Sequence, residues 1–213
     1  MKIRFILTGE GTSDLNLVDH IENILIEDGF EEASGEAPDL STLPRAVGRT
    51  VREKLAALVE LYPSADVIFV HRDADNAGHE IRRTEILSAA DILPGGMKLI
   101  PVIPVKELET WLLADRELIK SIAGNPDCKG NLDMIPGIKV LENLSDAKTT
   151  LLNALCEASE TQGSRLRKFK KRFPEMRARL AFALDSNGPV RLLESYQRFR
   201  ISVRSLSEIS FEA

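Results

Sequence analysis

The sequence of 213 residues is poor in cysteine and aromatic residues, and it has no long apolar run. Cys128 and Cys156 lie far apart, without a CxxC motif or a nearby histidine, which argues against a disulfide or zinc framework and predicts free thiols. The apolar run in "MKIRFILTGEGTSD" is too short for a signal peptide, and no stretch has membrane-spanning length. We therefore expect a cytoplasmic protein that has no membrane partner.

The nucleotide-binding signatures are also missing. No G-x-x-x-x-G-K-[ST] motif occurs, so any nucleotide-driven step would need a partner protein. Gly9 and Gly11 in "GEGTSD" permit a tight turn from a strand into a helix, whose N-terminus can attract phosphate. An ordinary strand-to-helix turn capped by Ser13 explains the same residues, and both interpretations stay open.

The charges are unevenly distributed. The net charge is −5, and 43% of the residues are hydrophobic, enough for a buried core. The stretch 165–179, "RLRKFKKRFPEMRAR", nevertheless contains eight Lys or Arg residues and one acid. A basic segment in an otherwise acidic chain suits an enzyme that acts on a polyanion through metal ions.

Strands and helices are predicted to alternate in the first half of the chain. The predicted strands are 2–8, 65–72 and 97–105, with a short strand also allowed in the polar segment 31–44. The predicted helices of this half are 13–29, 43–63, 79–93 and 107–123. This order predicts an α/β fold with a mostly parallel sheet of about four strands, covered by helices on both faces.

The rest of the chain is predicted to be helical. Apolar periodicity indicates helices at 146–158, at 162–184 with a break near Pro174, and at 189–199. We therefore expect one α/β domain over 1–115 and a helical C-terminal extension over 116–213 that packs on it.

Acidic residues follow two of the predicted strands. Glu10 comes just after strand 2–8, and Asp73 and Asp75 end the stretch "FVHRDAD" after strand 65–72. If these strands are neighbours, the three carboxylates converge at one edge of the sheet, where open parallel sheets bind ligands. Such oxygen ligands suit Mg²⁺, which would offset their repulsion. Solvated aspartates in a turn are the alternative explanation.

The segments "LTGEGTSDLNLV" and "VIFVHRDADN" resemble the TOPRIM domain of topoisomerases, primases and OLD-type nucleases. That domain carries a Glu in an E-G-x-x-D turn after its first strand and an Asp-x-Asp after a later strand. The resemblance assigns the turn to Glu10 and Asp14, and the pair to Asp73 and Asp75. It therefore implies a TOPRIM-like three-layer fold with these residues at the catalytic centre.

A second motif, "IPVKELETWLLAD", resembles a bacterial TOPRIM-related domain family of unknown function, through its acidic-x-acidic-x-Trp helix start. By motif, the two resemblances cover about 1–115. We expect Glu107 as a further metal ligand and Glu109 as a catalytic support at the same edge. Complementing a helix dipole is the alternative for both. Trp111 is expected to pack in the core rather than to stack on a nucleic-acid base.

Taken with the resemblance, the site predicts a Mg²⁺-dependent phosphodiester hydrolase, with Mn²⁺ as a substitute, that acts on DNA or RNA. Glu10, Asp73 and Asp75 would hold the metal. The nuclease relatives imply a role in phage defence beside a separate ATPase. With only two tyrosines and no DNA-gate domain, a topoisomerase is disfavoured. A non-catalytic binding module and a small-molecule phosphohydrolase remain as alternatives, and a homodimer is left open.

Supporting roles are expected for a few neighbours of the acids. Gly11 and Asp14 shape the first turn. His71 is a candidate general base or ligand, unless it simply ends its strand. Lys106 is a candidate phosphate contact or a surface lysine.

The basic run is the candidate nucleic-acid interface. Its alternative is an amphipathic helix with a solvated basic face and an apolar seam that includes Phe169 and Met176. The candidate phosphate contacts are Arg167, Lys168, Lys170 and Lys171.

Overall fold

The computed structural model describes residues 1–210, without the side chains of residues 12–14 and 208–210. The chain forms two compact units. The sheet unit comprises Met1–Ile103 and the chain from Arg198 onward, and the helical unit comprises Pro104–Gln197. The predicted boundary at residue 115 differs from this division, because residues 104–115 belong to the helical unit and the C-terminal part of the last helix belongs to the sheet unit.

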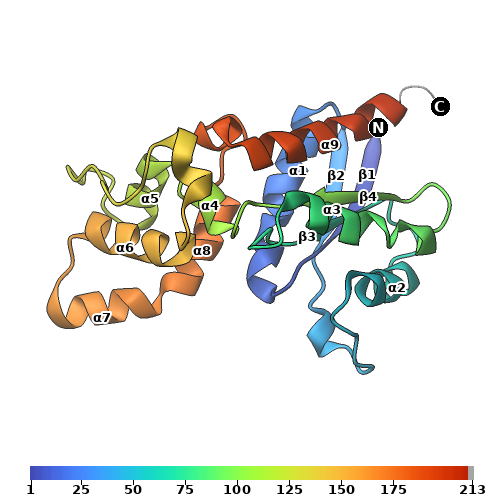
Figure 1. Cartoon of the computed structure of the whole chain (residues 1–213), viewed down its shortest axis with the longest axis horizontal. Helices are drawn as coiled ribbons and strands as arrows, with labels where there is room; N and C mark the ends of the chain where they lie inside the picture. Colours follow the sequence, from blue (N-terminus) through green and yellow to red (C-terminus); the bar gives the residue numbers. More distant parts are fainter. Residues whose placement is uncertain (211–213) are drawn as a thin grey trace. The chain divides into compact units, whose positions relative to one another are not determined.

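The sheet unit contains a four-stranded parallel sheet, as predicted (Figure 1). Its strands are β1 (Lys2–Thr8), β2 (Glu32–Glu36), β3 (Val67–His71) and β4 (Lys98–Val102), in the order β2-β1-β3-β4. The chain moves from β1 to one side for β2, then back past β1 for β3 and β4. The topological switch point therefore lies between β1 and β3. At the edge, β4 tolerates Pro101, which has no N–H to donate.

Within this unit, helices follow β1, β2 and β3. They are η1 (Thr12–Leu17), α1 (Val18–Glu27), η2 (Leu40–Thr42), α2 (Val51–Leu61), α3 (His79–Leu87) and η3 (Ala90–Ile92). The helix predicted from residue 43 begins only at Val51, because Thr50 and Glu53 form a capping box there. The helix predicted from residue 13 begins as the 3-10 helix η1.

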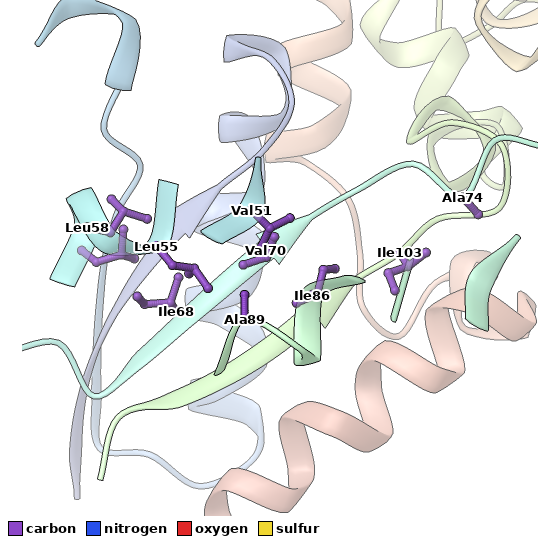
Figure 2. Packing of buried hydrophobic residues seen from close by; sticks show 10 residues of the cluster. Val51, Leu55, Leu58, Ile68, Val70, Ala74, Ile86, Ala89 and Ile103 are labelled. Carbon is purple, nitrogen blue, oxygen red and sulfur yellow. The ribbon is translucent and has the colours of Figure 1, made fainter. Parts of the chain in front are cut away.

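Helices cover both faces of the sheet, which gives the three layers that were expected. On one face, Ile6, Ile68 and Val70 pack against residues of α2 and α3 in a single hydrophobic cluster (Figure 2). On the other face, Phe69 makes edge contacts with Phe5 and with Phe199 of α9 (Glu194–Ser210). The connection from β1 to β2 crosses the sheet in the opposite direction to the connection from β2 to β3. Because both crossovers are right-handed, α1 lies on this second face, opposite to α2.

The helical unit is built from short helices. They are α4 (Glu109–Leu112), α5 (Arg116–Ile122), η4 (Ile138–Asn143), α6 (Ala147–Ser159), α7 (Gly163–Lys171), α8 (Phe173–Phe182), η5 (Pro189–Leu192) and the start of α9. The break near Pro174 is confirmed. The helix predicted over 107–123 is two helices, because Asp115 leaves helical geometry and caps α5, accepting the Leu118 N–H at 3.0 Å.

Trp111 forms the core of this unit, as expected. Its ring is fully buried, lies 5.0 Å from the Tyr196 ring, and donates its indole N–H to Ser195 at 2.8 Å. Across both units, none of the helices described has the length and apolar character needed to cross a membrane.

Candidate functional site

Glu10 and the Asp-x-Asp turn lie at the carboxyl ends of neighbouring strands. The register of β1 and β3 pairs Thr8 with Val70. Glu10 follows two residues after Thr8, and Asp73 follows three residues after Val70, so both turns leave the same edge at the switch point. Open α/β sheets bind ligands in this crevice.

Ala74, between the two aspartates, anchors their turn to the core. Its side chain is 2% exposed and belongs to the hydrophobic cluster that also contains Val70 and Ile103 (Figure 2). The next residue, Asp75, is exposed and adopts a left-handed backbone with φ 45°, a conformation that Asp tolerates better than most residues. The buried Ala74 therefore fixes the backbone from which Asp73 and Asp75 extend.

Arg72 links the turn after β1 to helix α3. Its Nε lies 3.1 Å from Oε1 of Glu10, and its Nη2 lies 3.3 Å from Oε1 of Glu85. Glu85 also binds Arg82, whose Nη1 lies 3.0 Å from Oε2. Two arginines thus share one glutamate of α3 while each contacts the loops that carry the predicted site.

Arg82 and His71 contact the aspartates. Arg82 donates from Nε to the Asp73 carbonyl at 3.1 Å, and its Nη2 lies 3.5 Å from Oδ2 of Asp75. The carboxylate of Asp73 lies 3.5 Å from Nε2 of His71, which is fully buried at the end of β3. Each of the three predicted metal-binding carboxylates therefore faces a basic side chain.

The fit of this site to Mg²⁺ depends on donor type and on orientation. Glu10, Asp73 and Asp75 offer the carboxylate oxygens that Mg²⁺ prefers, and their turns meet at one edge. Among the side chains described, however, no group of three or more His, Cys, Asp or Glu residues is arranged to hold a metal. The carboxylates are thus suitable ligands for Mg²⁺, but Glu10 and Asp75 are oriented toward Arg72 and Arg82. Metal binding would therefore require these two ion pairs to break.

A cavity of about 610 Å³ opens beside the turn after β1. Glu10, Gly11 and Arg72 line it, together with residues of the segment 38–49 and Lys54 of α2. Lys54 fixes the turn by donating from Nζ to the Gly9 carbonyl at 2.6 Å. Gly11 also lies on the cavity wall, and its role in shaping this turn stays a prediction.

The helical unit holds the other predicted acids. Glu109 is buried and forms an ion pair with the buried Arg177, with 2.7 Å between Oε1 and Nε. Glu107 accepts the Lys148 N–H at the start of α6 at 3.0 Å, and burial raises the pKa of its carboxyl group. Glu107 thus complements the N-terminus of α6 rather than that of its own helix. Lys106 before it has a left-handed φ of 65°.

The basic run forms α7 and part of α8. Phe169 of α7 is buried, whereas the four candidate phosphate contacts are exposed. The run is therefore an amphipathic helix with a solvated basic face, which is compatible with both interpretations of it. These exposed residues are Arg167, Lys168, Lys170 and Lys171.

Sequence reasoning missed the arginines of the site. Arg72 lies inside the motif "FVHRDAD", and Arg82 and Glu85 are three residues apart on α3, a spacing typical of helical ion pairs. These signals were present in the sequence. The Asp14 side chain lies outside the part of the chain that the structure describes.

Comparisons of the chain with protein-family models, with curated proteins and with solved structures give no match. The resemblance to the TOPRIM domain therefore rests on the motifs of the chain itself.

Proposed function

We propose that the sheet unit carries a Mg²⁺-dependent phosphodiester hydrolase site that acts on DNA or RNA. The observation that supports this most is the parallel pairing of β1 with β3, whose register sets Thr8 beside Val70. It brings the acids of two turns to the switch point of a parallel sheet, where ligands bind.

In this proposal Glu10, Asp73 and Asp75 hold the metal, with Mn²⁺ as a substitute. When bound, the ion would polarise a phosphoryl oxygen and lower the pKa of a bound water. His71 positions Asp73 from the buried end of β3. Arg72 and Arg82, released from the acids, have the fork geometry that binds phosphate oxygens.

A polymeric substrate is supported by the exposed basic face of α7, which can contact a phosphate backbone. The motifs also resemble those of nucleases. By analogy with these nucleases, we include in the proposal a role in phage defence together with a separate ATPase partner. These remain parts of the same proposal.

A second candidate is a non-catalytic binding module. The ion pairs favour it, because Arg72 and Arg82 already neutralise Glu10 and Asp75 without a metal. In such a module the same edge would bind a metal or a partner without cleaving a substrate.

The test is a cleavage assay with the purified chain on end-labelled single- and double-stranded DNA and RNA, in Mg²⁺, Mn²⁺ or EDTA. We expect metal-dependent cleavage that Asp73→Asn and Asp75→Asn each reduce by roughly 100-fold or more, because residues that merely orient metal ligands already account for about 10–100-fold. Asp19→Asn is the matched control, since Asp19 is an exposed residue of α1 that belongs to neither turn.

Three other outcomes separate the alternatives. Binding without cleavage in either metal favours the binding module. Hydrolysis of a small phosphodiester such as bis-p-nitrophenyl phosphate, with intact polymers, indicates the small-molecule phosphohydrolase. Cleavage that persists in both Asp73→Asn and Asp75→Asn would show that this site does not catalyse the reaction.

A further inference from the structure

The cavity beside the turn after β1 has the size of a ligand site. Its volume of about 610 Å³ lies within the roughly 300–1,000 Å³ typical of small-molecule pockets. It lies wholly in the sheet unit, at the carboxyl ends of β1 and β2. The proposed catalytic edge adjoins it, because Glu10 and Arg72 line the cavity and also form the ion pair of that edge.

Basic residues form part of the cavity lining. Arg49, Lys54 and Arg72 line it, against the acids Glu10 and Asp39. Arg72 neutralises Glu10, and Lys54 is held near the cavity by its bond to a backbone carbonyl. Arg49 is exposed and forms no ion pair with any side chain that the structure describes. Among the side chains that the structure describes, the lining therefore has one cation more than acids, and an anionic ligand would neutralise it.

Asp39 does not point to a bound cation. Its Oδ1 accepts the Ser41 N–H at 3.0 Å and the Ser41 hydroxyl at 2.6 Å, and these bonds hold the pKa of Asp39 below its ordinary value. It therefore caps η2 and shapes the rim of the cavity.

Another part of the lining is apolar. Five aliphatic residues contribute to it, and such side chains offer a surface on which a flat ring can pack. They are Leu15, Pro38, Leu40, Ala46 and Val47, here called the aliphatic wall. Aliphatic and cationic side chains in one lining match the two halves of a nucleotide, a base and a phosphate.

We propose that this cavity binds one unpaired nucleotide, with the base against the aliphatic wall and the phosphate toward Arg49 and Lys54. The inference deepens the proposed function and rests on it for the claim that the bound nucleotide belongs to a substrate. It assigns the substrate to single-stranded nucleic acid or frayed ends, because a base that is stacked and paired in a duplex cannot enter a pocket.

The experiment measures binding in EDTA, so that cleavage plays no part. Calorimetry compares adenosine 5′-monophosphate, adenosine and ribose 5-phosphate as probes of the two walls. We expect the nucleotide to bind more tightly than either fragment. Arg49→Gln should weaken nucleotide binding about tenfold, the worth of one hydrogen bond to a charged group, and leave adenosine binding unchanged.

Arg45→Gln is the matched control. Arg45 is an exposed arginine of the same loop, but it lines a different cleft and not this cavity. The control should bind the nucleotide like the wild type. Thermal unfolding of both variants checks that they fold. A single-stranded oligonucleotide should compete with the bound nucleotide, and a blunt duplex should not.

The outcomes distinguish this inference from the proposed function. Asp73→Asn should abolish cleavage yet retain nucleotide binding, so a chain that binds but never cleaves keeps the cavity assignment and loses the hydrolase. Equal nucleotide affinity in Arg49→Gln and Arg45→Gln would overturn the cavity assignment. So would a ribose 5-phosphate affinity equal to that of the nucleotide, because the aliphatic wall would then receive no base.

Discussion

Arg72 lies between two glutamates, with Glu10 3.1 Å from its Nε and Glu85 3.3 Å from its Nη2. Arg82 shares Glu85 and reaches Asp75. The repulsion among the acids of this edge is thus offset by protein cations. A hydrophobic strand can therefore end in Asp-x-Asp in the absence of a metal, because the turn brings its own counter-ions.

The first prediction concerns competition between Arg72 and Mg²⁺. In Arg72→Gln, Glu10 loses its partner, so Mg²⁺ should raise the melting temperature more than it does in the wild type. Without the metal, the variant should lose about 1 kcal/mol, the upper range for partly exposed ion pairs. Arg83→Gln removes the same charge from an exposed position of α3 and serves as the control. An identical Mg²⁺ response in all three proteins would argue against metal binding at Glu10.

The second prediction concerns the buried Glu109–Arg177 pair. Glu109→Gln leaves Arg177 buried without its carboxylate, so the free energy of unfolding should fall by about 3–5 kcal/mol. Glu117→Gln removes an exposed carboxylate that pairs with the half-buried Lys120, and it should cost less than about 1 kcal/mol because the exposed acid is well solvated. Urea unfolding measures both. A negligible cost for Glu109→Gln would mean that Glu109 is not needed for stability, and it would favour the catalytic role that its motif suggests.

The regular elements of the fold were largely predictable from local pattern. The β-branched and aromatic residues of β1 and β3 predict strands, and Pro174 predicts the break between α7 and α8. The strand–helix order predicted that Glu10 and Asp73 share one edge if their strands are neighbours, and the pairing of β1 with β3 meets that condition. Some element limits were readable but missed, since Thr50 and Glu53 have the spacing of a capping box.

Long-range pairing was not predictable. Glu109 and Arg177 are 68 residues apart, and their contact depends on how α4 and α8 pack. Arg49 lies in an irregular loop whose position on the cavity wall follows from tertiary packing alone. Local periodicity carries no information about such distant partners, so the Glu109–Arg177 pair and the position of Arg49 emerged only from the structure, whereas Arg72 and Arg82 had local signals that were missed.

The third prediction concerns pH. Asp28 accepts from Arg200 at 2.9 Å, yet burial raises the pKa of its carboxyl group above the ordinary value of 3.8, outweighing the lowering by Arg200 and Arg204. The folded chain then binds a proton more tightly than the unfolded chain. The stability from this group is therefore complete below the ordinary value and is lost as pH rises through the raised pKa.

Asp28→Asn cannot titrate and isolates this effect. The free energy of unfolding of the wild type, relative to the variant, should decrease as pH rises across the acidic range above 3.8. Urea unfolding at a series of pH values measures it. A relative stability that increases with pH would mean that the ion pairs outweigh burial.

The fourth prediction concerns the basic face of α7. Changing its four candidate contacts to Gln should weaken nucleic-acid binding and reduce the salt slope by about 0.9 for each lost contact with duplex DNA. Helix propensity barely changes, so folding should persist. The four residues are Arg167, Lys168, Lys170 and Lys171.

A control with the same charge change uses exposed residues elsewhere in the helical unit. The four control positions are Lys129, Lys139, Lys148 and Arg191. Affinity titrated against salt measures both variants. If the two lose affinity and slope equally, binding reflects net charge, and α7 is only a solvated helix face.

The most direct measurement locates the metal on the chain. Fe²⁺ substituted for Mg²⁺, with ascorbate and peroxide, generates radicals that cut the polypeptide near the ion, and mass spectrometry identifies the cuts. We predict cuts near Glu10 and near residues 73–75 that excess Mg²⁺ suppresses, that persist in Asp19→Asn and that disappear in Asp73→Asn. Cuts confined to other segments, or cuts at these turns that persist in Asp73→Asn, would contradict a metal-dependent site at the switch point.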